Sequence, residues 1–215
     1  MDLTFKTAND AFIYYYDFIR SFGYDFDNTK TLFNQSFTIL NPIDRNIDCD
    51  YRKWNLNYAE YEYQWYLSKN RSVEDIKKIA KIWDKMHNGD NIVNSNYGYQ
   101  WSRNNQLDYV INELKTNPLS RKACISIYDG KEHSEYKYDT PCTLSIVFYI
   151  YDNKLQMSVY MRSNDLWFGF CNDQYCFSKL MEYIAHCLDI EVGTYYHSVT
   201  NLHLYNDKLN KNDRK

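Results

Sequence analysis

The most informative stretch of the chain is MRSNDLWFGFCND, residues 161–173. It sets an arginine, several polar side chains and a glycine between two regular patterns. A strand-like alternation covers 155–163, and the apolar residues of 173–188 recur at helical spacing. A polar, glycine-containing connection of this kind is rarely only a linker, so we expect the segment to contribute to a binding site.

Length and composition indicate one compact domain. With 215 residues, of which 44% are hydrophobic and 18% aromatic, the chain can bury a substantial core. Six glycines and three prolines are too few for a long flexible linker, and no internal repeat or change of composition is visible. We therefore expect a single domain over residues 1–215, with a charged, frayed tail at about 206–215.

Charge and cysteine content argue against several classes of partner. The net charge of −3 comes without a basic stripe, which argues against direct nucleic-acid binding. The six cysteines lack zinc-type spacing, so we expect no metal site. The first residues lack a secretory leader, and the longest apolar run, 144–151, is too short for a membrane span. We expect a cytoplasmic protein with reduced thiols that does not bind membranes.

Periodicity places most helices before most strands. Helices are expected at 8–22, 56–69, 73–86, 104–115 and 173–188, and strands at 36–41, 123–128, 142–151, 155–163 and 195–205. The dipeptide Asp152-Asn153 between two of these strands is a hairpin signal. This order predicts an α+β fold in which helices cover a sheet.

Cys142 and Glu62 are the candidates for catalysis. Strand alternation puts Cys142 on the apolar face with Ile146, which is typical of a small buried thiol, whereas a nucleophile would need a nearby cation such as Arg162. Glu62 shares a helical face with aromatic residues. It is either a solvated acid at the edge of that face or a pocket carboxylate that moves protons.

The other polar candidates also have ordinary interpretations. Arg121 and Lys122 are either solvated side chains or, together with Arg162, a clamp for a phosphate dianion. Asp173 also fits a helix cap, and His203 fits a structural histidine in a strand. Taken singly, these residues do not decide between the two kinds of interpretation.

In their order along the chain, seven segments resemble motifs of the thymidylate synthase superfamily. They are EYQWY (62–66), IW (82–83), NYGYQW (96–101), NPLSRK (117–122), TPCT (140–143), RSND (162–165) and LHLY (202–205). The matches extend from about residue 60 to 205 and cover most of the chain. The resemblance implies a single thymidylate synthase-like domain with a mixed sheet covered by helices, and a homodimer built on a sheet face with shared active sites.

The same resemblance implies a mechanism and a set of site residues. Cys142 would add to carbon 6 of a pyrimidine nucleotide, 5,10-methylenetetrahydrofolate would donate a one-carbon unit to carbon 5, and Glu62 would manage water and protons. Asp173 would read the base. The nucleotide would also be held by Arg162, Ser163, His203 and Tyr205, and by Arg121 and Lys122 of the neighbouring subunit. The folate would contact Ile82, Trp83, Asp165 and Gly169.

Asp173 indicates a branch of the superfamily. Thymidylate synthases have an asparagine at this position, which donates to oxygen 4 of uracil and accepts from its ring N–H. Cytosine reverses those two groups, and a carboxyl that shares a proton can serve both. Thr143, in place of a histidine, and Met161, in place of a glutamine, also resemble the phage hydroxymethylases of DNA precursors. The expected product is 5-hydroxymethyl-deoxycytidylate.

Two alternatives stay open. The first is the same chemistry on deoxyuridylate, giving hydroxymethyl-dUMP or thymidylate. The second, of another class, is a nucleotide-binding or interaction protein that kept the scaffold without turnover. Lys122 in place of a second arginine, and the ten residues after Tyr205, favour the second. The early arginine loop of the synthases is not evident, and Lys30 or Arg45 would have to replace it.

Overall fold

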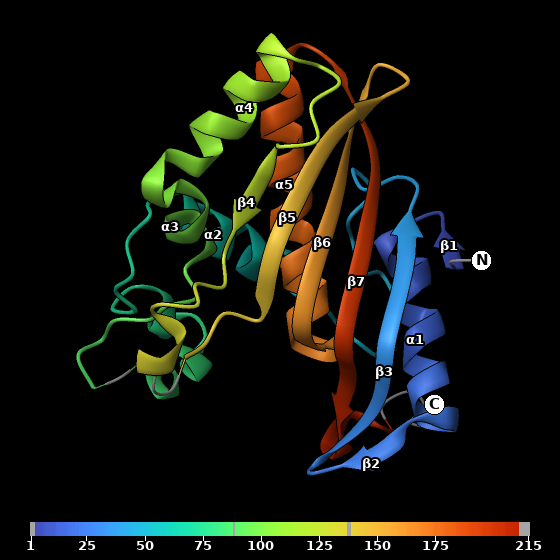
Figure 1. The fold of residues 1–215 in the computed structure, drawn as a ribbon. Helices are drawn as coiled ribbons and strands as arrows, with labels where there is room; N and C mark the ends of the chain where they lie inside the picture. Colours follow the sequence, from blue (N-terminus) through green and yellow to red (C-terminus); the bar gives the residue numbers. More distant parts are fainter. Residues whose placement is uncertain (1–2, 88, 137–138, 211–215) are drawn as a thin grey trace.

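The computed structural model describes residues 3–87, 89–136 and 139–210 (Figure 1). Its centre is a seven-stranded sheet in the order β1-β3-β7-β6-β5-β4, with β2 beside β3. The strands are β1 (Leu3–Phe5), β2 (Tyr24–Phe26), β3 (Thr29–Ile39), β4 (Cys124–Ser126), β5 (Thr143–Tyr151), β6 (Lys154–Asp165) and β7 (Glu191–Tyr205).

The helices gather on one side of this sheet, with α1 behind β3 and α5 behind β5 and β6 (Figure 1). The α-helices are α1 (Ala8–Phe22), α2 (Leu56–Leu67), α3 (Tyr97–Ser102), α4 (Gln106–Thr116) and α5 (Cys171–Leu188). The short turns are η1 (Ile76–Lys78), η2 (Lys81–Lys85), η3 (Arg103–Asn105), η4 (His133–Glu135), the π-helical η5 (Leu166–Phe170) and η6 (Asn206–Lys208). The expected α+β architecture is confirmed.

Strand directions bring three chain segments to one end of the sheet. β6 and β7 are parallel, with α5 as the crossover between them, and Asp165 pairs with His203 near their ends. β5 is antiparallel to β6, so its first residue, Thr143, lies at the same end. At the opposite end, Asp152 and Asn153 both have the left-handed φ values, 53° and 54°, that a two-residue hairpin turn favours.

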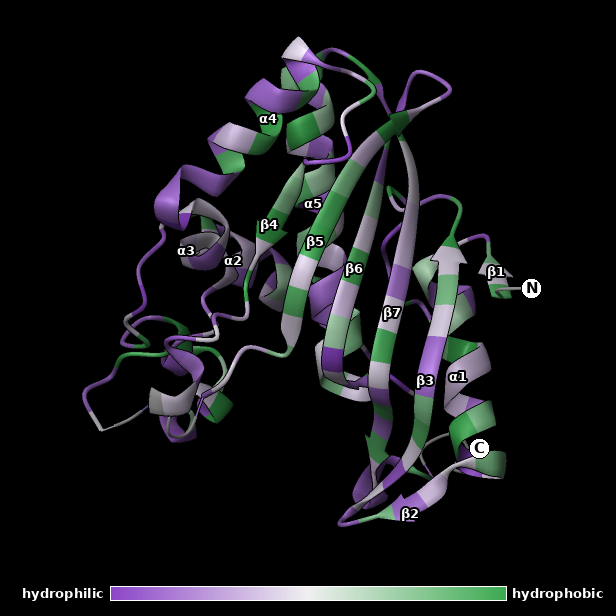
Figure 2. Cartoon of the chain, viewed as in Figure 1, coloured by the Kyte–Doolittle hydropathy of each residue, from purple (hydrophilic) through white to green (hydrophobic). Residues whose placement is uncertain are grey.

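The core lies between the sheet and the helices. The apolar face of α5 is buried as its periodicity predicts, and Phe12 and Tyr15 of α1 are fully buried beside it. Hydrophobic and hydrophilic bands alternate along β6 and β7 (Figure 2), as expected for strands that bury one face. The polar residues at the ends of these strands are therefore held on a packed scaffold.

The expected helix over 73–86 is wrong. The segment forms the separate turns η1 and η2, because Ala80 between them is extended, with φ −131° and ψ 104°. The break accompanies a tertiary contact: the ring of Trp83 packs edge-on against that of Trp65, with centroids 4.9 Å apart. Packing of this kind overrides a helical pattern whose intrinsic preference is weak.

The expected phase of β5 is also wrong at its start. The strand alternates regularly from Ile146 onward, but a β-bulge between Thr143 and Ser145 shifts its register against β6. As a result Thr143 is fully buried, while Cys142 precedes the strand and is only half-buried. A bulge re-aims neighbouring side chains, and here the thiol does not join the apolar face of Ile146.

Several boundaries differ from the sequence-based expectation. β3 is longer than 36–41, and β1, β2 and α3 were not expected. Of the tail, Asn206–Lys208 forms η6, and the Tyr16 hydroxyl lies 2.9 Å from the carbonyl oxygen of Lys208. Residues 211–215 lie outside the described part. In the part that is described, no helix combines the length and apolar character needed to cross a bilayer.

Candidate active site

A cavity of about 310 Å³ opens at the end of the sheet where β6 and β7 finish and β5 begins. Its walls come from α2, η2, the residues before β5, the ends of β6 and β7, η5 and the first turn of α5. Every predicted site residue lines it except Arg121, Lys122 and Arg162. The fold thus brings together residues that are up to 143 positions apart in the sequence, from Glu62 to Tyr205.

Cys142 faces the cavity beside a guanidinium group. The Arg162 Nη2 atom is 3.7 Å from the Cys142 sulfur and also donates to the carbonyl oxygen of Thr140 at 2.8 Å. Burial raises the pKa of the thiol to about 11, although Arg162 acts to lower it, and the Asp173 carboxyl adds to the rise. The thiol is therefore protonated at neutral pH, and forming a thiolate requires a base or additional positive charge.

Glu62 is a buried carboxyl that accepts a hydrogen bond from Tyr58, which in turn accepts one from Trp83. It is 4% exposed, and the Tyr58 hydroxyl donates to its Oε1 at 2.9 Å. The indole N–H of Trp83 in turn donates to the Tyr58 oxygen at 3.0 Å. Burial raises the pKa of Glu62 to about 7, so at neutral pH this group can both accept and release a proton. The interpretation as a solvated acid is wrong.

Asp173 is not the cap of α5. It lies in the first turn, and the preceding turn η5 is capped instead by Asp165. The Asn164 amide donates to the Asp173 Oδ2 atom at 2.8 Å. Burial, and secondarily the charge of Glu62, hold the pKa of Asp173 well above its usual range. A protonated carboxyl offers one donor and one acceptor, the pair that a cytosine edge requires.

Asp165 and Gly169 shape the turn at the cavity wall. The Asp165 carboxylate accepts from the backbone N–H groups of Trp167, at 2.9 Å, and Phe168, at 3.1 Å. A Cβ atom added to Gly169 would lie 2.9 Å from the Asn164 amide nitrogen, so the turn approaches this side chain too closely for any larger residue to fit without a shift. The structure gives both residues a role in holding the turn, besides lining the cavity.

His203 and Tyr205 close the cavity on the β7 side. The His203 Nδ1 atom is 3.0 Å from the Asn201 amide oxygen, and its ring meets that of Tyr205 edge-on at 5.5 Å. Both residues and Ser163 also line an adjoining pocket of about 170 Å³, whose other walls are largely polar. Three of the predicted nucleotide-binding residues therefore lie at the junction of two hollows.

The mouth of the cavity is apolar. Ile82 and Phe168 both line it although their side chains are 58% and 51% exposed, and the Trp83 ring lies deeper, at 8%. Exposed large apolar side chains beside a cavity indicate a surface that a ligand can cover. Ile82 and Trp83 were predicted from the sequence, and Phe168 was not.

Arg121 and Lys122 do not reach this cavity within one chain. Both are exposed and precede β4, whose first residue, Cys124, pairs with Val147 in the middle of β5. The antiparallel register therefore places them toward the hairpin end of β5, away from Cys142.

Lys30 and Arg45 do not line the cavity either. Arg45 is buried, and its guanidinium pairs with Glu182 at 2.5 Å. The Lys30 ammonium lies 3.5 Å from Asp25. Among the described cations, Arg162 is therefore the one whose charge adjoins Cys142.

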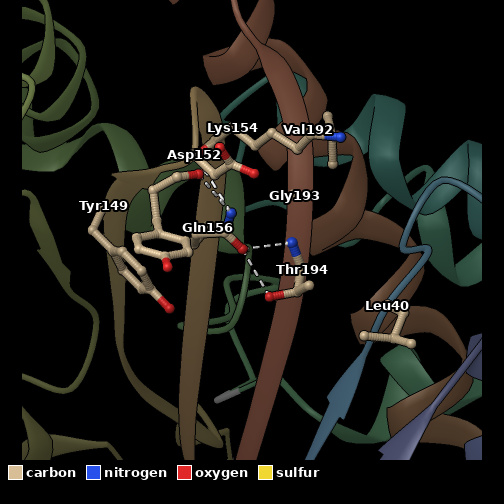
Figure 3. A pocket seen from close by; sticks show the side chains of 9 residues that line it. Leu40, Tyr149, Asp152, Lys154, Gln156, Val192, Gly193 and Thr194 are labelled. Atoms are coloured by element: carbon tan, nitrogen blue, oxygen red, sulfur yellow. Dashed lines mark hydrogen bonds between the residues drawn. The ribbon is translucent and has the colours of Figure 1, made fainter.

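A second hollow, of about 610 Å³, lies at the hairpin end of the sheet (Figure 3). The Gln156 side chain crosses it, and its Oε1 accepts from the backbone N–H and the hydroxyl of Thr194, both at 2.8 Å. Lys154 on its wall pairs with Glu191 at 2.8 Å. None of the predicted site residues lies there.

Sequence reasoning missed several residues of the cavity wall. Tyr58 lies one turn before Glu62, and that spacing could have identified it. Asp139 anchors the wall by accepting from the backbone N–H groups of Asn94, at 2.6 Å, and Ser95, at 2.7 Å, but no local pattern marks it. Asn164 lies within the RSND motif, where nothing in the spacing distinguishes it. In the part of the chain described, no cluster of three His, Cys, Asp or Glu residues could hold a metal ion.

Comparison with known proteins identifies the family. The model of the thymidylate synthase family matches residues 30–215. The deoxycytidylate 5-hydroxymethyltransferases of Enterobacteria phages T4 and T6 are each 34% identical over 168 residues, which cover 70% of this chain and 68% of theirs. The thymidylate synthase of Bacillus atrophaeus is 28% identical over 162 residues, 71% of this chain and 70% of its own. The chain belongs to the thymidylate synthase family.

Proposed function

We propose that the protein is a deoxycytidylate 5-hydroxymethyltransferase. Enzymes of its family transfer one-carbon units to pyrimidine nucleotides, and the 34% identical phage relatives bear this name. The observation that carries the choice of cytosine is the buried carboxyl of Asp173, in the cavity that Cys142 also lines. A carboxyl that keeps a proton can accept from the cytosine amino group and donate to its ring nitrogen.

The chain's own residues support covalent chemistry on the base. The Cys142 sulfur would add to carbon 6, which makes carbon 5 nucleophilic. Glu62, whose pKa of about 7 suits proton transfer at neutral pH, would take up and return the protons and orient the water that completes the hydroxymethyl group. Arg162, beside the sulfur, would favour the thiolate.

The phosphate and sugar would lie toward β7. Ser163, His203 and Tyr205 line both the cavity and the adjoining polar pocket, which suits a ribose and its phosphate. The Arg162 guanidinium supplies one positive charge, whereas a phosphate dianion carries two negative charges. We therefore propose a homodimer in which Arg121 and Lys122 of a second copy complete the site, since both are exposed and lie away from the cavity of their own chain.

The apolar mouth fits a folate. Ile82, Trp83 and Phe168 would cover its ring system, while Gly169 and Asp165 keep the turn close beneath it. Bound there, 5,10-methylenetetrahydrofolate would supply the one-carbon unit.

Two other functions have specific support. Use of deoxyuridylate, as in thymidylate synthases, is favoured by relatives of that name. Nucleotide binding without turnover is favoured by the pKa of Cys142, which is raised to about 11, and by the shortage of cations at the cavity.

Incubation with 5,10-methylenetetrahydrofolate and either dCMP or dUMP, followed by mass spectrometry of the nucleotide, separates these functions. The expected product is 5-hydroxymethyl-dCMP, and turnover of dUMP alone would contradict the proposal. Release of tritium from carbon 5 of labelled dCMP reports attack by Cys142 even if the transfer fails. A protein that binds dCMP but releases no tritium would fit the binding-only alternative.

A further inference from the structure

Asn164 is a buried residue of the cavity wall that has no role in the proposed mechanism. It is 2% exposed, near the end of β6, and its amide nitrogen donates to the Oδ2 atom of Asp173 at 2.8 Å. Its own Oδ1 atom has no hydrogen-bond partner among the described residues. Among the described residues, the hydrogen bond to Asp173 is therefore the one that the Asn164 side chain makes.

A protonated carboxyl distinguishes cytosine from uracil only while its proton stays on one particular oxygen. Cytosine presents an amino donor and a ring-nitrogen acceptor, and uracil presents an oxygen acceptor and an N–H donor. By moving its proton from one oxygen to the other, a carboxylic acid can match either pair. Selective reading of cytosine thus requires a group that fixes the proton on one particular oxygen.

We infer that Asn164 is a specificity-determining residue, which fixes the Asp173 proton on Oδ1 and keeps Oδ2 as an acceptor. An N–H donor pointing at Oδ2 disfavours an O–H on that oxygen, because two donors would then face each other. Oδ2 accepts from the cytosine amino group and Oδ1 donates to the ring nitrogen. This inference rests on the proposed cytosine nucleotide and explains how an acid can exclude uracil.

Gly169 supports this arrangement from the adjacent turn. A Cβ atom at this position would lie 2.9 Å from the Asn164 amide nitrogen and 3.5 Å from the Asp173 Oδ2 atom. The absence of a side chain therefore lets the amide and the carboxyl meet in a tightly packed wall. A substitution there would displace the amide without changing either partner.

The test compares the affinities of dCMP and dUMP for the wild-type chain and for Asn164→Leu by titration calorimetry. Leucine has a similar volume but no donor. We expect the preference for dCMP over dUMP to fall roughly 10- to 100-fold, because the mismatched buried donor or acceptor that now rejects dUMP costs about 1–3 kcal/mol. The matched control is Asn172→Leu, which removes another amide of the cavity wall, one that accepts from Trp54 instead of contacting Asp173, and it should alter both affinities alike.

Infrared spectroscopy provides a readout that a merely structural role would not change. The carbonyl stretch of protonated Asp173, identified by its absence in Asp173→Asn, should move to higher frequency in Asn164→Leu because the carbonyl loses its N–H donor. If Asn164→Leu fails to fold, Gly169→Ala should change both readouts in the same direction by less.

The outcomes separate this inference from the proposed function. A wild-type preference for dCMP that Asn164→Leu leaves intact would overturn the role of Asn164 alone. An equal loss of affinity for both nucleotides in Asn164→Leu, or a carbonyl band of Asp173 that does not shift, would also overturn the role of Asn164 alone. A wild-type preference for dUMP would overturn the proposed function and this inference together.

Discussion

The hollows at the two ends of the sheet differ in chemistry more than in size. The hollow at the β5–β6 hairpin is the larger, about 610 Å³ against 310 Å³, yet the Gln156 side chain that crosses it is paired with Thr194, and Lys154 on its wall is paired with Glu191. The cavity at the other end holds a thiol and buried carboxyls, Cys142, Glu62 and Asp173, whose pKa values are all raised.

This difference indicates that the burial of titratable side chains, and not the volume of a hollow, marks the candidate active site. Burying titratable groups costs free energy, so a protein keeps them together mainly where they have a function. Satisfied polar groups around a hollow carry no such cost and suit a structural role. Substitutions at the cavity should therefore mainly lower activity, and substitutions at the hairpin end should mainly lower stability. The expected effects on activity differ in size, from the nucleophile to the hairpin end.

Replacement of the nucleophile should have the largest effect. Cys142→Ser should reduce the release of tritium from carbon 5 of dCMP by roughly 10³-fold or more, because a serine hydroxyl is a far weaker nucleophile than a thiolate. Tyr149→Phe, in the hollow at the hairpin, is the control and should change the rate less than about twofold. Retained tritium release in Cys142→Ser would exclude Cys142 as the attacking group.

The change of base preference should come next. Asp173→Ala removes both the acceptor and the donor that would face the base, so kcat/KM for dCMP relative to dUMP should fall by roughly 10²- to 10⁴-fold. The measurement is competition between the two nucleotides, with products separated by mass. An unchanged ratio would show that Asp173 does not read the base.

Glu62→Gln should affect both rate and stability. The rate should fall roughly 10²-fold through loss of proton transfer, and the inflection near pH 7 in kcat/KM should disappear. Folded Glu62 titrates near 7 and an ordinary glutamate near 4.5. The stability from protonated Glu62 is therefore complete below about pH 4.5 and is lost as pH rises through 7.

Glutamine does not titrate, so Glu62→Gln should gain on the wild type over that pH range, by up to about 3 kcal/mol at pH 8. Urea unfolding of both proteins at pH 4.5 and pH 8 measures this gain. A stability difference that does not depend on pH would contradict the raised pKa.

The smallest effect on activity is expected at the hairpin end. Gln156→Leu leaves the backbone N–H of Thr194 without its partner, so the free energy of unfolding should fall by about 1–3 kcal/mol. The kcat/KM for dCMP should stay within about twofold of the wild type. A large loss of activity without loss of fold would show that the two ends of the sheet are functionally linked.

Features governed by local sequence were predictable. α1, α2, α4 and α5 follow apolar periodicity, and the β5–β6 hairpin follows the Asp152-Asn153 turn signal. The order of seven short motifs was enough to indicate the family, and most of the proposed site residues lie together as that order implies.

Features governed by contacts distant in sequence were not predictable. The bulge at Thr143 that brings Cys142 to the cavity depends on the pairing of β5 with β6. The break at Ala80 accompanies the packing of Trp83 on Trp65. The contact of Asn164 with Asp173 joins a strand to a helix across η5, and no spacing rule marks it.

Trapping of a covalent adduct with dCMP that carries fluorine at carbon 5 tests most directly whether Cys142 attacks carbon 6 of a cytosine nucleotide. Fluorine cannot leave as a cation, so the adduct between sulfur and carbon 6 should persist in the presence of 5,10-methylenetetrahydrofolate. Peptide mass mapping should then find the fluorinated cytosine nucleotide on the peptide that contains Cys142. An adduct that forms only with the fluorinated uracil nucleotide would exclude cytosine as the base, and an adduct on another of the six cysteines would exclude Cys142 as the nucleophile.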